Sequence, residues 1–557
     1  MKTTQMNGSD ILVECLIEQG VDLLFGYPGG SVLNIYDALH KYSDKITHIR
    51  TAHEQGAAHA ADGYARASGR VGVCLATSGP GATNLVTGIA TAYMDSVPMV
   101  VLTGNVPRPF LGKDSFQEVD MLGISMPITK HNFIVKDVTK IAETVRAAFR
   151  IAQSGRPGPV LIDITKDATG AMADFTPQTP APILPKTETI RSEDIDAALA
   201  CIRASKKPLI LAGGGLVSGG ASDLFLQFVE KMDAPVALSI MGLGGFPSSH
   251  PNFTGMIGMH GTRTSNISAQ KCDLLIALGT RFSDRVIGNA AQFAHRAKVL
   301  HIDIDPAEIN KNIKAHYSVV GDLAAILKQL NEKLEPQSHP EWQEDVAALK
   351  RTYPLSYPQE GLTPQFVMET INRLTKGEAR FSTDVGQHQM FACQFISHEK
   401  PRHLITSGGL GTMGFGLGAA IGAKFADPAT TVISITGDGC FRMNNIELAT
   451  AAENNLPLVV VIINNQVLGM VRQWQTLFYE KRYSHTTLPP GPDFVKIAEG
   501  NGAVAFSVKE RDELEPILKK AIDLQKTVVV NVELGPDEKV FPMLPPGGSI
   551  DAFVDED

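Results

Sequence analysis

Short runs of apolar, β-branched residues alternate with amphipathic helical patterns along this chain. In the first third the runs are VGVCLATSG, VPMVVLTG and GPVLIDI, and DILVECLIEQGV is one of the helical patterns. Similar sets recur in the middle (KPLILAGGG, APVALSIMG, CDLLIALGTRF) and in the last third (TVISITGDG, LPLVVVIINN, TVVVNVEL). Strands that alternate with helices form βαβ units, in which the strands lie parallel in one sheet. The pattern therefore predicts an α/β fold with parallel sheets.

The interruptions between these sets predict the domain organisation. At about 100 to 200 residues per domain, a chain of 557 residues has room for three domains. The Pro/Thr-rich stretch TPQTPAPILPK within residues 167–190 continues neither a helix nor a strand, and a helical connector over residues 341–357 precedes the last set. We therefore predict three doubly wound parallel-sheet domains, at residues 1–170, 190–335 and 361–540.

The charge balance and the cysteine pattern exclude several classes of protein. Fifty Lys and Arg residues face 59 Asp and Glu residues, a net charge of −9, and no basic run occurs, which argues against a nucleic-acid surface. The N-terminal apolar stretch contains acidic residues, and no apolar run approaches the ~18 residues of a membrane span. The six cysteines are scattered without a C-x-x-C pair, so we expect reduced thiols, no disulfide or zinc site, and a cytoplasmic location.

One segment of the first domain resembles one segment of the third. VGVCLATSGPGATN (71–84) and TVISITGDGCFRMN (431–444) both have the pattern of a strand, a Gly-rich turn and the start of a helix. The similarity is too weak to prove duplication. It suggests two similar halves that face one ligand, with the middle domain serving another purpose.

Two polar motifs end neighbouring apolar strands of the third domain. Gly437, Asp438 and Gly439 follow one strand, and Asn465 follows the next. Because the carboxyl ends of parallel strands meet at one edge of a sheet, Asp438 and Asn465 should converge there. One carboxylate and one amide oxygen suit Mg²⁺, which also binds substrate phosphates, and the glycines would let backbone N–H groups approach a diphosphate. Either motif alone could be only a turn or a helix cap, but together they predict a magnesium diphosphate site.

The span from Gly437 to Asn465 resembles the motif by which thiamine-diphosphate-dependent enzymes hold their cofactor. Within that group, segments such as NNQVLGMVRQWQ, AHEQGAAHAADGYAR, GLGTMGFG and GTRFSDRV are similar to the acetohydroxyacid synthase, or acetolactate synthase, family. The similarity covers nearly the whole chain, about Asp10 to Gly548. It implies thiamine diphosphate and Mg²⁺ as cofactors, with the main-chain carbonyl of Val467 as a third metal ligand.

The resemblance also assigns roles at the reacting end of the cofactor. By resemblance Glu54 is the carboxyl group that hydrogen-bonds the thiamine pyrimidine ring and so produces the tautomer that acts as base. The short neighbours from Ala52 to Ala60 would let Glu54 sit against a ring. Met413 matches the family's apolar wedge, which bends the cofactor between its two rings. Without the resemblance, Glu54 would be a solvated surface group and Met413 a core side chain.

A further set of matched residues implies the substrates. In the family, a two-carbon unit from pyruvate joins a second 2-keto acid, so an apolar pocket with one cation for the acceptor carboxylate is expected. By resemblance Phe116, Met470 and Trp474 form the apolar wall, and Trp474 matches the tryptophan that favours 2-ketobutyrate. Arg285 matches the carboxylate partner, because guanidinium grips carboxylates with two bonds. Without the resemblance, Trp474 could be ordinary helix packing and Arg285 an exposed charge. The other matched positions near the active site are Gln117 and Lys130.

The middle domain is similar to an FAD-binding domain. Its segment LILAGGGLVSGG (209–220) is a strand that enters a Gly-rich turn. Because it lacks a clean G-x-G-x-x-G it is a weak dinucleotide fingerprint, which a tight turn would also explain. The family binds a largely structural FAD here, although FAD-free catabolic relatives exist. The matched contact positions are Arg156, Gly213, Gly214, Gly215, Met259, His260, Gly279, Arg281, Asp303 and Asp322.

The resemblance implies an activity and a set of partners. Two pyruvates would give 2-acetolactate and CO₂, and pyruvate with 2-ketobutyrate would give 2-aceto-2-hydroxybutyrate, the entry steps to branched-chain amino acids. In the family Glu54 of one subunit faces the Asp438/Asn465 site of its neighbour, which implies a homodimer or a dimer of dimers. A small regulatory subunit is the other implied partner.

Three alternatives stay open at this point. A pyruvate oxidase that uses FAD, or a related 2-keto acid decarboxylase, would share the architecture, but Trp474 and Arg285 in their motifs argue against it. Glyoxylate carboligase fits less well because that enzyme lacks the glutamate found here as Glu54. A non-catalytic binding protein could keep the fold, but intact Glu54, Asp438 and Asn465 argue against this.

Overall fold

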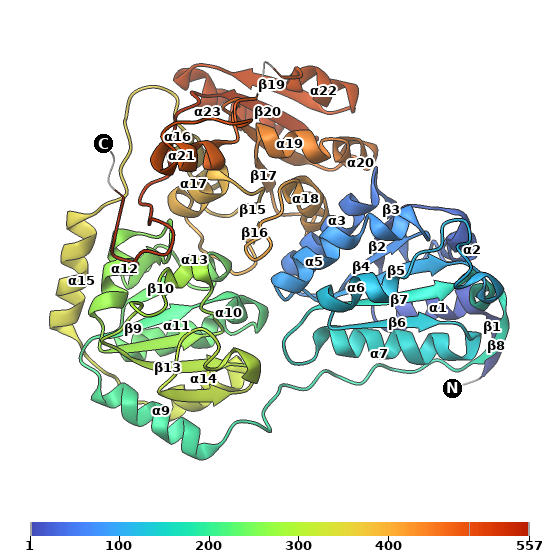
Figure 1. The fold of residues 1–557 in the computed structure, drawn as a ribbon, viewed down its shortest axis with the longest axis horizontal. Helices are drawn as coiled ribbons and strands as arrows, with labels where there is room; N and C mark the ends of the chain where they lie inside the picture. Colours follow the sequence, from blue (N-terminus) through green and yellow to red (C-terminus); the bar gives the residue numbers. More distant parts are fainter. Residues whose placement is uncertain (1–2, 489–490, 555–557) are drawn as a thin grey trace.

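Three six-stranded parallel sheets form the body of the molecule in a computed structural model, which describes residues 3–488 and 491–554. Figure 1 shows each sheet in a lobe of its own, blue for the first, green for the middle and orange to red for the third. The predicted α/β class with three parallel sheets is confirmed. Among the described residues, no helix has the length and apolar composition to cross a bilayer.

The first sheet has the strand order β3-β2-β4-β5-β7-β6. Its strands are β2 (Leu23–Gly26), β3 (Thr47–Arg50), β4 (Gly72–Ala76), β5 (Met99–Asn105), β6 (His131–Val135) and β7 (Pro159–Thr165). Side chains alternate across a strand, so Val73 and Leu75 of β4 face one core and Cys74 and Ala76 the other. Helices α1 (Gly8–Glu18), α2 (Leu33–Lys41) and α7 (Ile141–Gln153) cover the first face, and α3 (Glu54–Ser68) and α5 (Val86–Met94) cover the second.

The third sheet repeats the topology of the first. Its order is β16-β15-β17-β18-β20-β19, so both sheets have the order 2-1-3-4-6-5 when strands are numbered within each sheet. The strands are β15 (Arg380–Thr383), β16 (Leu404–Thr406), β17 (Val432–Gly437), β18 (Leu458–Asn464), β19 (Val504–Val508) and β20 (Val528–Glu533). The helices are α16 (Pro364–Thr375), α17 (Gln387–Phe395), α18 (Phe415–Ala426), α19 (Asp438–Asn444), α20 (Glu447–Glu453), α21 (Gly469–Phe478), α22 (Phe494–Gly500) and α23 (Arg511–Asp523). The weak sequence similarity between 71–84 and 431–444 therefore reflects two domains of the same topology.

The middle sheet has a different order, β11-β10-β9-β12-β13-β14. Its strands are β9 (Pro208–Ala212), β10 (Val236–Leu238), β11 (Phe253–Met256), β12 (Leu274–Leu278), β13 (Lys298–Asp303) and β14 (Tyr317–Val320). Helices α9 (Ser192–Ala204), α11 (Ser222–Met232) and α14 (Leu323–Lys333) pack on one face, and α12 (Arg263–Lys271) and α15 (Pro340–Thr352) on the other. This is the 3-2-1-4-5-6 order of dinucleotide-binding sheets, whose crevice opens where the order reverses, between β9 and β12.

The first and third domains share one continuous core, in which α3 packs against α18. The two helices approach closely because small residues face each other: a methyl group added at Gly63 would lie 2.1 Å from the carbonyl oxygen of Ala419, and one at Gly422 would lie 1.8 Å from that of Ala60. Figure 1 shows α3 and α18 side by side between the two lobes. The contact fixes the first domain on the third within one chain.

The first linker differs from the prediction at its start. Helix α8 (Lys166–Gly170) and strand β8 (Met172–Phe175) lie there, and β8 pairs antiparallel with β1 (Thr4–Asn7) at the chain's N-terminal end. The pairing joins segments more than 160 residues apart, so no local pattern indicates it. Residues 176–190 carry no helix or strand, as the proline-rich composition predicts.

Candidate functional site

A small cavity lies at the carboxyl edge of the third sheet. Strands β17 and β18 are neighbours, with Gly437 paired to Ile463, and the chain then continues into Asp438 and Asn465. Both residues line a cavity of about 80 Å³. The other residues singled out from the sequence that line it are Gly437, Gly439, Val467, Met413 and Met470. The two motifs therefore converge in the structure at one edge of the sheet.

Asp438 has the properties of a cation ligand. Its carboxyl group is buried, and burial raises its pKa to about 6, against the opposing effect of Arg442. Its Oδ2 atom is buried and has no hydrogen-bond partner among the described residues. Buried polar atoms are normally paired, so an oxygen left in this state at the lining of a cavity fits a bound cation.

The rest of this donor set consists of neutral oxygens. The Oδ1 atom of Asn465 accepts a bond from the backbone N–H of Val467 at 3.4 Å. Within the described residues, no group of three His, Cys, Asp or Glu side chains could hold a metal ion. A cation here would therefore rely on one carboxylate, amide and main-chain oxygens, and phosphate or water, a hard oxygen set that suits Mg²⁺.

Two further residues of this cavity were missed from the sequence, Gln387 and His388 at the start of α17. The Nε2 atom of Gln387 donates to Oε1 of Gln473 at 2.9 Å. The His388 ring is buried, its Nε2 atom has no partner in the described part of the chain, and burial lowers its pKa to about 3. A neutral imidazole therefore faces the cavity. The signal was available: the polar run GQHQ follows strand β15 at the same sheet edge.

A second, larger cavity of about 1290 Å³ opens at the switch point of the middle sheet. Gly213 to Gly215 follow β9 and Gly279 follows β12, so both turns meet there. A methyl group at Gly213 would lie 2.4 Å from the carbonyl oxygen of Gly279, and one at Gly215 would lie 2.7 Å from its Cα atom. Glycine at these positions lets the two turns touch and exposes their backbone to the cavity.

Most residues matched to FAD contacts line this cavity, and one does not. Those that line it are Arg156, Gly213, Gly214, Gly215, Met259, His260, Gly279, Arg281 and Asp303. Burial raises the pKa of Asp303 to about 6, and the Nδ1 atom of His260 is buried without a partner among the described residues. Asp322 instead caps helix α14, where its Oδ1 atom accepts from the N–H of Ala325 at 2.9 Å.

Arg156 links two domains at the rim of this cavity. Its Nη1 atom donates to Oε1 of Glu308 at 2.7 Å and to Oδ2 of Asp305 at 3.3 Å, both in the middle domain. Its Nε atom donates to the Ser96 hydroxyl of the first domain at 2.8 Å. The guanidinium is therefore held by groups of both domains, and two of them, Ser96 and Glu308, also line the cavity.

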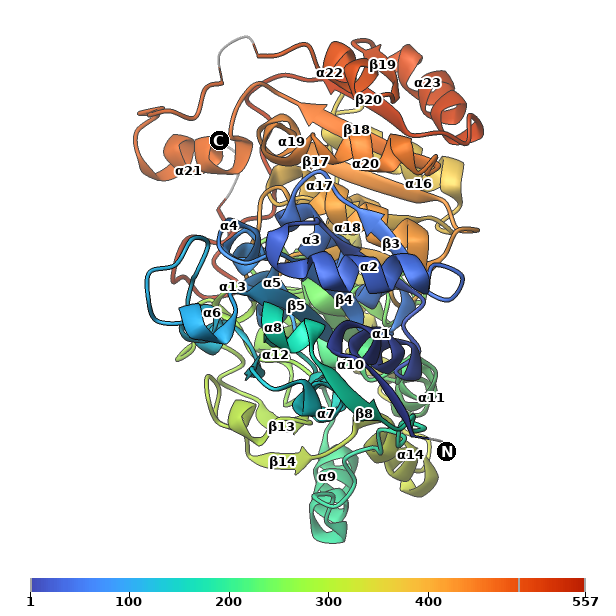
Figure 2. The ribbon, with the colours of Figure 1, turned by 90° about the vertical axis from the view of Figure 1, so that its right-hand side faces the viewer.

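The same cavity extends to the residues matched to the acceptor substrate. Arg285, Met470 and Trp474 all line it. The guanidinium carbon of Arg285 lies 6.0 Å from the centre of the Trp474 ring, and the Arg285 side chain is 63% exposed. Helix α21, which carries Met470 and Trp474, projects from the third domain on the side of α19 (Figure 2). A cation beside an aromatic ring at an open cavity can receive a small carboxylate.

Four other matched residues of the first domain, Glu54, Phe116, Gln117 and Lys130, line neither cavity. The Oε2 atom of Glu54 accepts a bond from Nδ2 of Asn84 at 3.0 Å, and the Phe116 side chain is 87% exposed. Gln117 has a left-handed backbone, with φ of 60°. The Nζ atom of Lys130 donates to the Ser154 carbonyl at 2.7 Å, and burial lowers its pKa to about 8. One chain therefore leaves these four matched residues outside both cavities.

Comparison with protein families gives three matches in chain order. A thiamine pyrophosphate enzyme N-terminal TPP binding domain matches residues 6–124, the central domain of such enzymes matches 195–330, and the C-terminal TPP binding domain matches 384–532. Curated relatives extend the similarity to the whole chain. A "probable acetolactate synthase large subunit" from Methanocaldococcus jannaschii is 48% identical, over 99% of this chain and 95% of the relative.

Bacterial relatives are similar to this chain over the same extent. The acetolactate synthase large subunit of Corynebacterium glutamicum is 47% identical, over 98% of this chain and 89% of its own length. The acetolactate synthase isozyme 3 large subunit of Escherichia coli is 45% identical over 98% of both chains. The chain belongs to the acetolactate synthase large subunits. Its three domains are those of a thiamine pyrophosphate enzyme.

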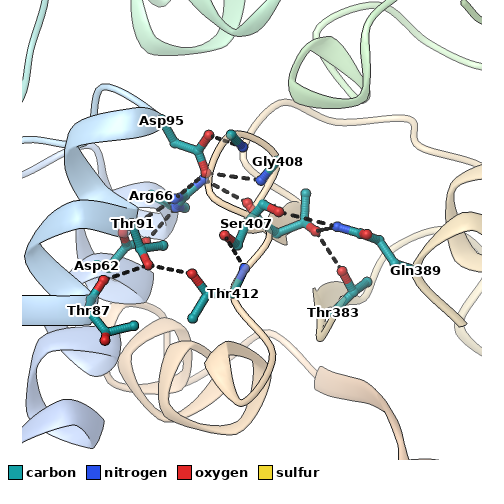
Figure 3. Close-up of polar contacts among 12 residues, drawn as sticks. Asp62, Arg66, Thr87, Thr91, Asp95, Thr383, Gln389, Ser407, Gly408 and Thr412 are labelled. Carbon is teal, nitrogen blue, oxygen red and sulfur yellow. Dashed lines mark hydrogen bonds and ion pairs between the residues drawn. The ribbon is translucent and has the colours of Figure 1, made fainter. Parts of the chain in front are cut away.

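The first domain also holds a wall of the larger cavity. Asp95, at the end of α5, accepts bonds from the backbone N–H groups of Gly408 (3.0 Å) and Gly409 (2.7 Å), which line the cavity. Figure 3 shows the Asp95 carboxylate between these groups and Arg66, whose Nη2 atom donates to it at 3.0 Å. Arg66 also pairs with Asp62 of α3, and both acidic side chains are fully buried. The buried ion network thus fixes the loop at residues 407–411.

Proposed function

We propose that the protein makes 2-acetolactate and CO₂ from two pyruvate molecules, and 2-aceto-2-hydroxybutyrate from pyruvate and 2-ketobutyrate. Thiamine diphosphate, Mg²⁺ and FAD are the proposed cofactors. The observation that carries the proposal is the position of Arg285 and Trp474, in a cavity that adjoins the Asp438 edge of the third sheet, with Met470 at both. This position places the Arg285 guanidinium, which can bind a carboxylate, next to a thiamine pyrophosphate binding domain.

The residues of the smaller cavity fit Mg²⁺ and a diphosphate. Asp438, Asn465 and the main-chain carbonyl of Val467 would hold the ion, because the buried Oδ2 atom of Asp438 needs a positive partner. Thiamine diphosphate, when bound, supplies the carbon atom that attacks a keto group and accepts the electron pair released with CO₂. Gly437 and Gly439 leave the backbone at this edge open to phosphate oxygens.

Glu54 would hold a proton at the pyrimidine ring of the cofactor. Its carboxyl group is half-buried at the start of α3, and Asn84 binds one of its oxygens, so the other is available to a ring nitrogen. Met413, at the smaller cavity beside Gly439, is the proposed wedge under the two rings.

The acceptor substrate would bind beside α21. Arg285 would pair with its carboxylate, and Met470 and Trp474 would pack against its alkyl part, excluding water from the reacting atoms. An aromatic wall favours the larger alkyl group of 2-ketobutyrate through apolar contact. Phe116, Gln117 and Lys130 would complete this pocket from a second chain.

FAD fits the larger cavity. The 3-2-1-4-5-6 sheet order and the touching glycine turns at its switch point support a dinucleotide there. So does the buried Nδ1 atom of His260, which has no partner among the described residues. The residues that would contact FAD are those already named in the lining of the larger cavity. Asp322 is a further proposed contact, although it lies outside this lining. FAD would serve a structural role.

The separation of the matched residues supports a homodimer or dimer of dimers. Glu54 and Phe116 line neither of the cavities that Asp438 and Trp474 line, and a second chain would bring them to the site. The Corynebacterium glutamicum and Escherichia coli relatives are named large subunits, which supports a small regulatory subunit as a partner. The domain limits 1–170, 190–335 and 361–540 and the cytoplasmic location stay predictions.

The test is an omission assay on the purified protein. Pyruvate is supplied with Mg²⁺, thiamine diphosphate and FAD, each cofactor is left out in turn, and acetolactate, acetaldehyde, acetate and O₂ uptake are measured. We expect acetolactate that depends on all three cofactors, without matching O₂ uptake. Acetate formed with O₂ consumption would overturn the proposal in favour of an oxidase, and acetaldehyde alone would indicate a decarboxylase.

A further inference from the structure

We propose that Glu447 is a positioning residue for Glu54, and that the third domain thereby sets the position of the first domain's cofactor-binding carboxyl group within the same chain. The inference rests on the proposed role of Glu54. Nothing in the resemblance or in the family matches assigns a function to Glu447.

The contacts of Glu447 reach the two residues that precede Glu54. Its Oε1 atom accepts from the backbone N–H of His53 at 3.0 Å, and its Oε2 atom accepts from that of Ala52 at 3.1 Å. The hydroxyl of Thr450, one turn further along α20, donates to the same Oε2 atom at 2.7 Å and lies 3.0 Å from the Ala52 nitrogen. One carboxylate and one hydroxyl thus hold two consecutive N–H groups.

These N–H groups determine how α3 begins. Glu54 is the first residue of α3, and His53 is its N-cap, in an extended conformation, with its Nδ1 atom accepting from the Gln55 N–H at 3.1 Å. In the described part of the chain, the backbone N–H groups of Ala52 and His53 find their acceptors in α20. Fixing both therefore fixes the backbone from which the Glu54 side chain projects.

The local sequence accommodates this carboxylate. Glu447 is 1% exposed, and a methyl group added at Gly56 would lie 2.0 Å from its Oε1 atom. Gly56 is therefore required for Glu447 to lie against the first turn of α3, within a segment otherwise rich in alanine. A buried carboxylate is retained only when donors compensate for its lost hydration, and here three donors do so.

A positioning role differs from simple adhesion between domains. The first and third domains are already held by the α3 and α18 packing and by the buried Asp62, Arg66 and Asp95 network. Loss of the Glu447 contacts should therefore leave the domains joined and loosen the turn before Glu54. Function should fall more than stability.

The test compares Glu447→Gln with Glu54→Gln and with the double variant, all as the full-length protein. The amide keeps the shape of the side chain but turns an NH₂ group toward a backbone N–H. The main readout is deuterium exchange at C2 of bound thiamine diphosphate, measured by NMR without pyruvate, so that it does not depend on turnover. Cofactor affinity, melting temperature and kcat are measured alongside, and Glu453→Gln, an exposed glutamate at the end of α20, is the matched control.

We expect Glu447→Gln to slow C2 exchange and kcat by about 10- to 100-fold, the scale of a misplaced catalytic group. Cofactor affinity should stay close to that of the wild type, and Glu453→Gln should change nothing. In the Glu54→Gln background, Glu447→Gln should cause no further loss, because residues that act through one group are not additive.

Wild-type exchange in Glu447→Gln, or a full additional loss in the double variant, would overturn the inference. If Glu447→Gln does not fold, Thr450→Val against Thr450→Ser asks the same question, because only serine retains the hydroxyl bond. The two proposals can fail separately. If C2 exchange is slower in Glu447→Gln than in the wild type, but the wild type makes no acetolactate, the proposed function is overturned and the positioning role is supported.

Discussion

At the scale of single residues, four buried carboxyl groups of this chain differ in their surroundings and hydrogen bonds. Asp438 and Asp303 line cavities, and burial raises the pKa of each to about 6. Glu447 and Asp95 accept several hydrogen bonds from other domains and serve as anchors. A carboxyl group that faces a cavity and has a shifted pKa is a candidate for ligand binding. A carboxyl group that accepts several backbone hydrogen bonds fixes the position of the backbone.

Glu54→Gln tests the proposed proton-holding residue. The variant keeps the bond from Asn84 but cannot exchange a proton, so we expect an unchanged fold and a turnover lower by roughly 10² to 10⁴. Steady-state acetolactate formation and circular dichroism measure the two effects. Glu143→Gln, an exposed glutamate of the same domain paired with Lys140, is the control. Turnover equal to the wild type would remove Glu54 from the mechanism.

Asp163 gives a prediction about pH and stability. Its buried carboxyl group, bonded by Thr103 and Asn105, has a pKa raised by burial to about 6, against about 4 in an unfolded chain. The folded state therefore binds a proton that the unfolded state has lost between these values, and this contribution to stability falls as pH rises through the window. Asp163→Asn lacks this titration.

The melting temperature of Asp163→Asn, relative to the wild type, should therefore increase from pH 4 to pH 7. Calorimetry across this range measures the difference, and other titrating groups cancel because both proteins share them. A difference that is constant with pH would contradict the assigned burial effect.

At the scale of elements, small residues decide how close two helices or turns approach. The contact between α3 and α18 tolerates no side chain at Gly422, where a methyl group would meet the Ala60 carbonyl oxygen at 1.8 Å. We expect Gly422→Ala to destabilise the protein by about 1 to 3 kcal/mol, the usual range for overpacking. Urea unfolding measures this change.

The control for Gly422→Ala is Gly500→Ala, at the end of α22, where the added methyl group meets nothing within 4 Å. This variant should be as stable as the wild type or slightly more so, because alanine loses less chain entropy on folding. Equal destabilisation by both variants would show that the contact between α3 and α18 does not specifically exclude a side chain at Gly422.

The glycine turns of the middle sheet give a second element-scale prediction. Gly215→Ala would push the turn after β9 away from Gly279, whose Cα atom lies 2.7 Å from the added methyl position. We expect the purified variant to retain much less FAD, measured by flavin absorbance per chain, while Gly535→Ala, which meets nothing within 4 Å, retains a normal amount. Full flavin content in Gly215→Ala would contradict the proposed FAD site.

At the scale of the whole molecule, the separation of matched residues predicts sites shared between chains. Glu54→Gln and Asp438→Ala chains should each be almost inactive alone. When they are mixed and allowed to exchange subunits, a mixed dimer has one site with both native residues, so about a quarter of all sites should regain activity for a twofold dimer. Acetolactate formation before and after mixing measures this recovery.

No recovery from chains that demonstrably exchange would place Glu54 and Asp438 of one chain in the same site. Size-exclusion chromatography with differently tagged chains establishes the exchange independently. A mixture of the wild type with the Asp438→Ala chain provides the reference for an exchanging, partly active dimer.

The sequence by itself determined the parallel-sheet class, the three sets of strands and the edge at which Asp438 and Asn465 meet. These follow from local periodicity and from the rule that parallel strands end at one edge, so no knowledge of distant contacts was needed. The motif similarity likewise indicated the family, which the relatives confirm.

Tertiary structure decided the rest, because it depends on residues distant in the sequence. The identical topology of the first and third domains, the pairing of β1 with β8, and the contact of Glu447 with the turn before Glu54 all join segments that no local pattern links. His388 could have been noticed in the polar run GQHQ, but only the fold places it at the smaller cavity. Gly213 and Gly279, 66 positions apart, meet at the wall of the larger cavity, where an added side chain would collide.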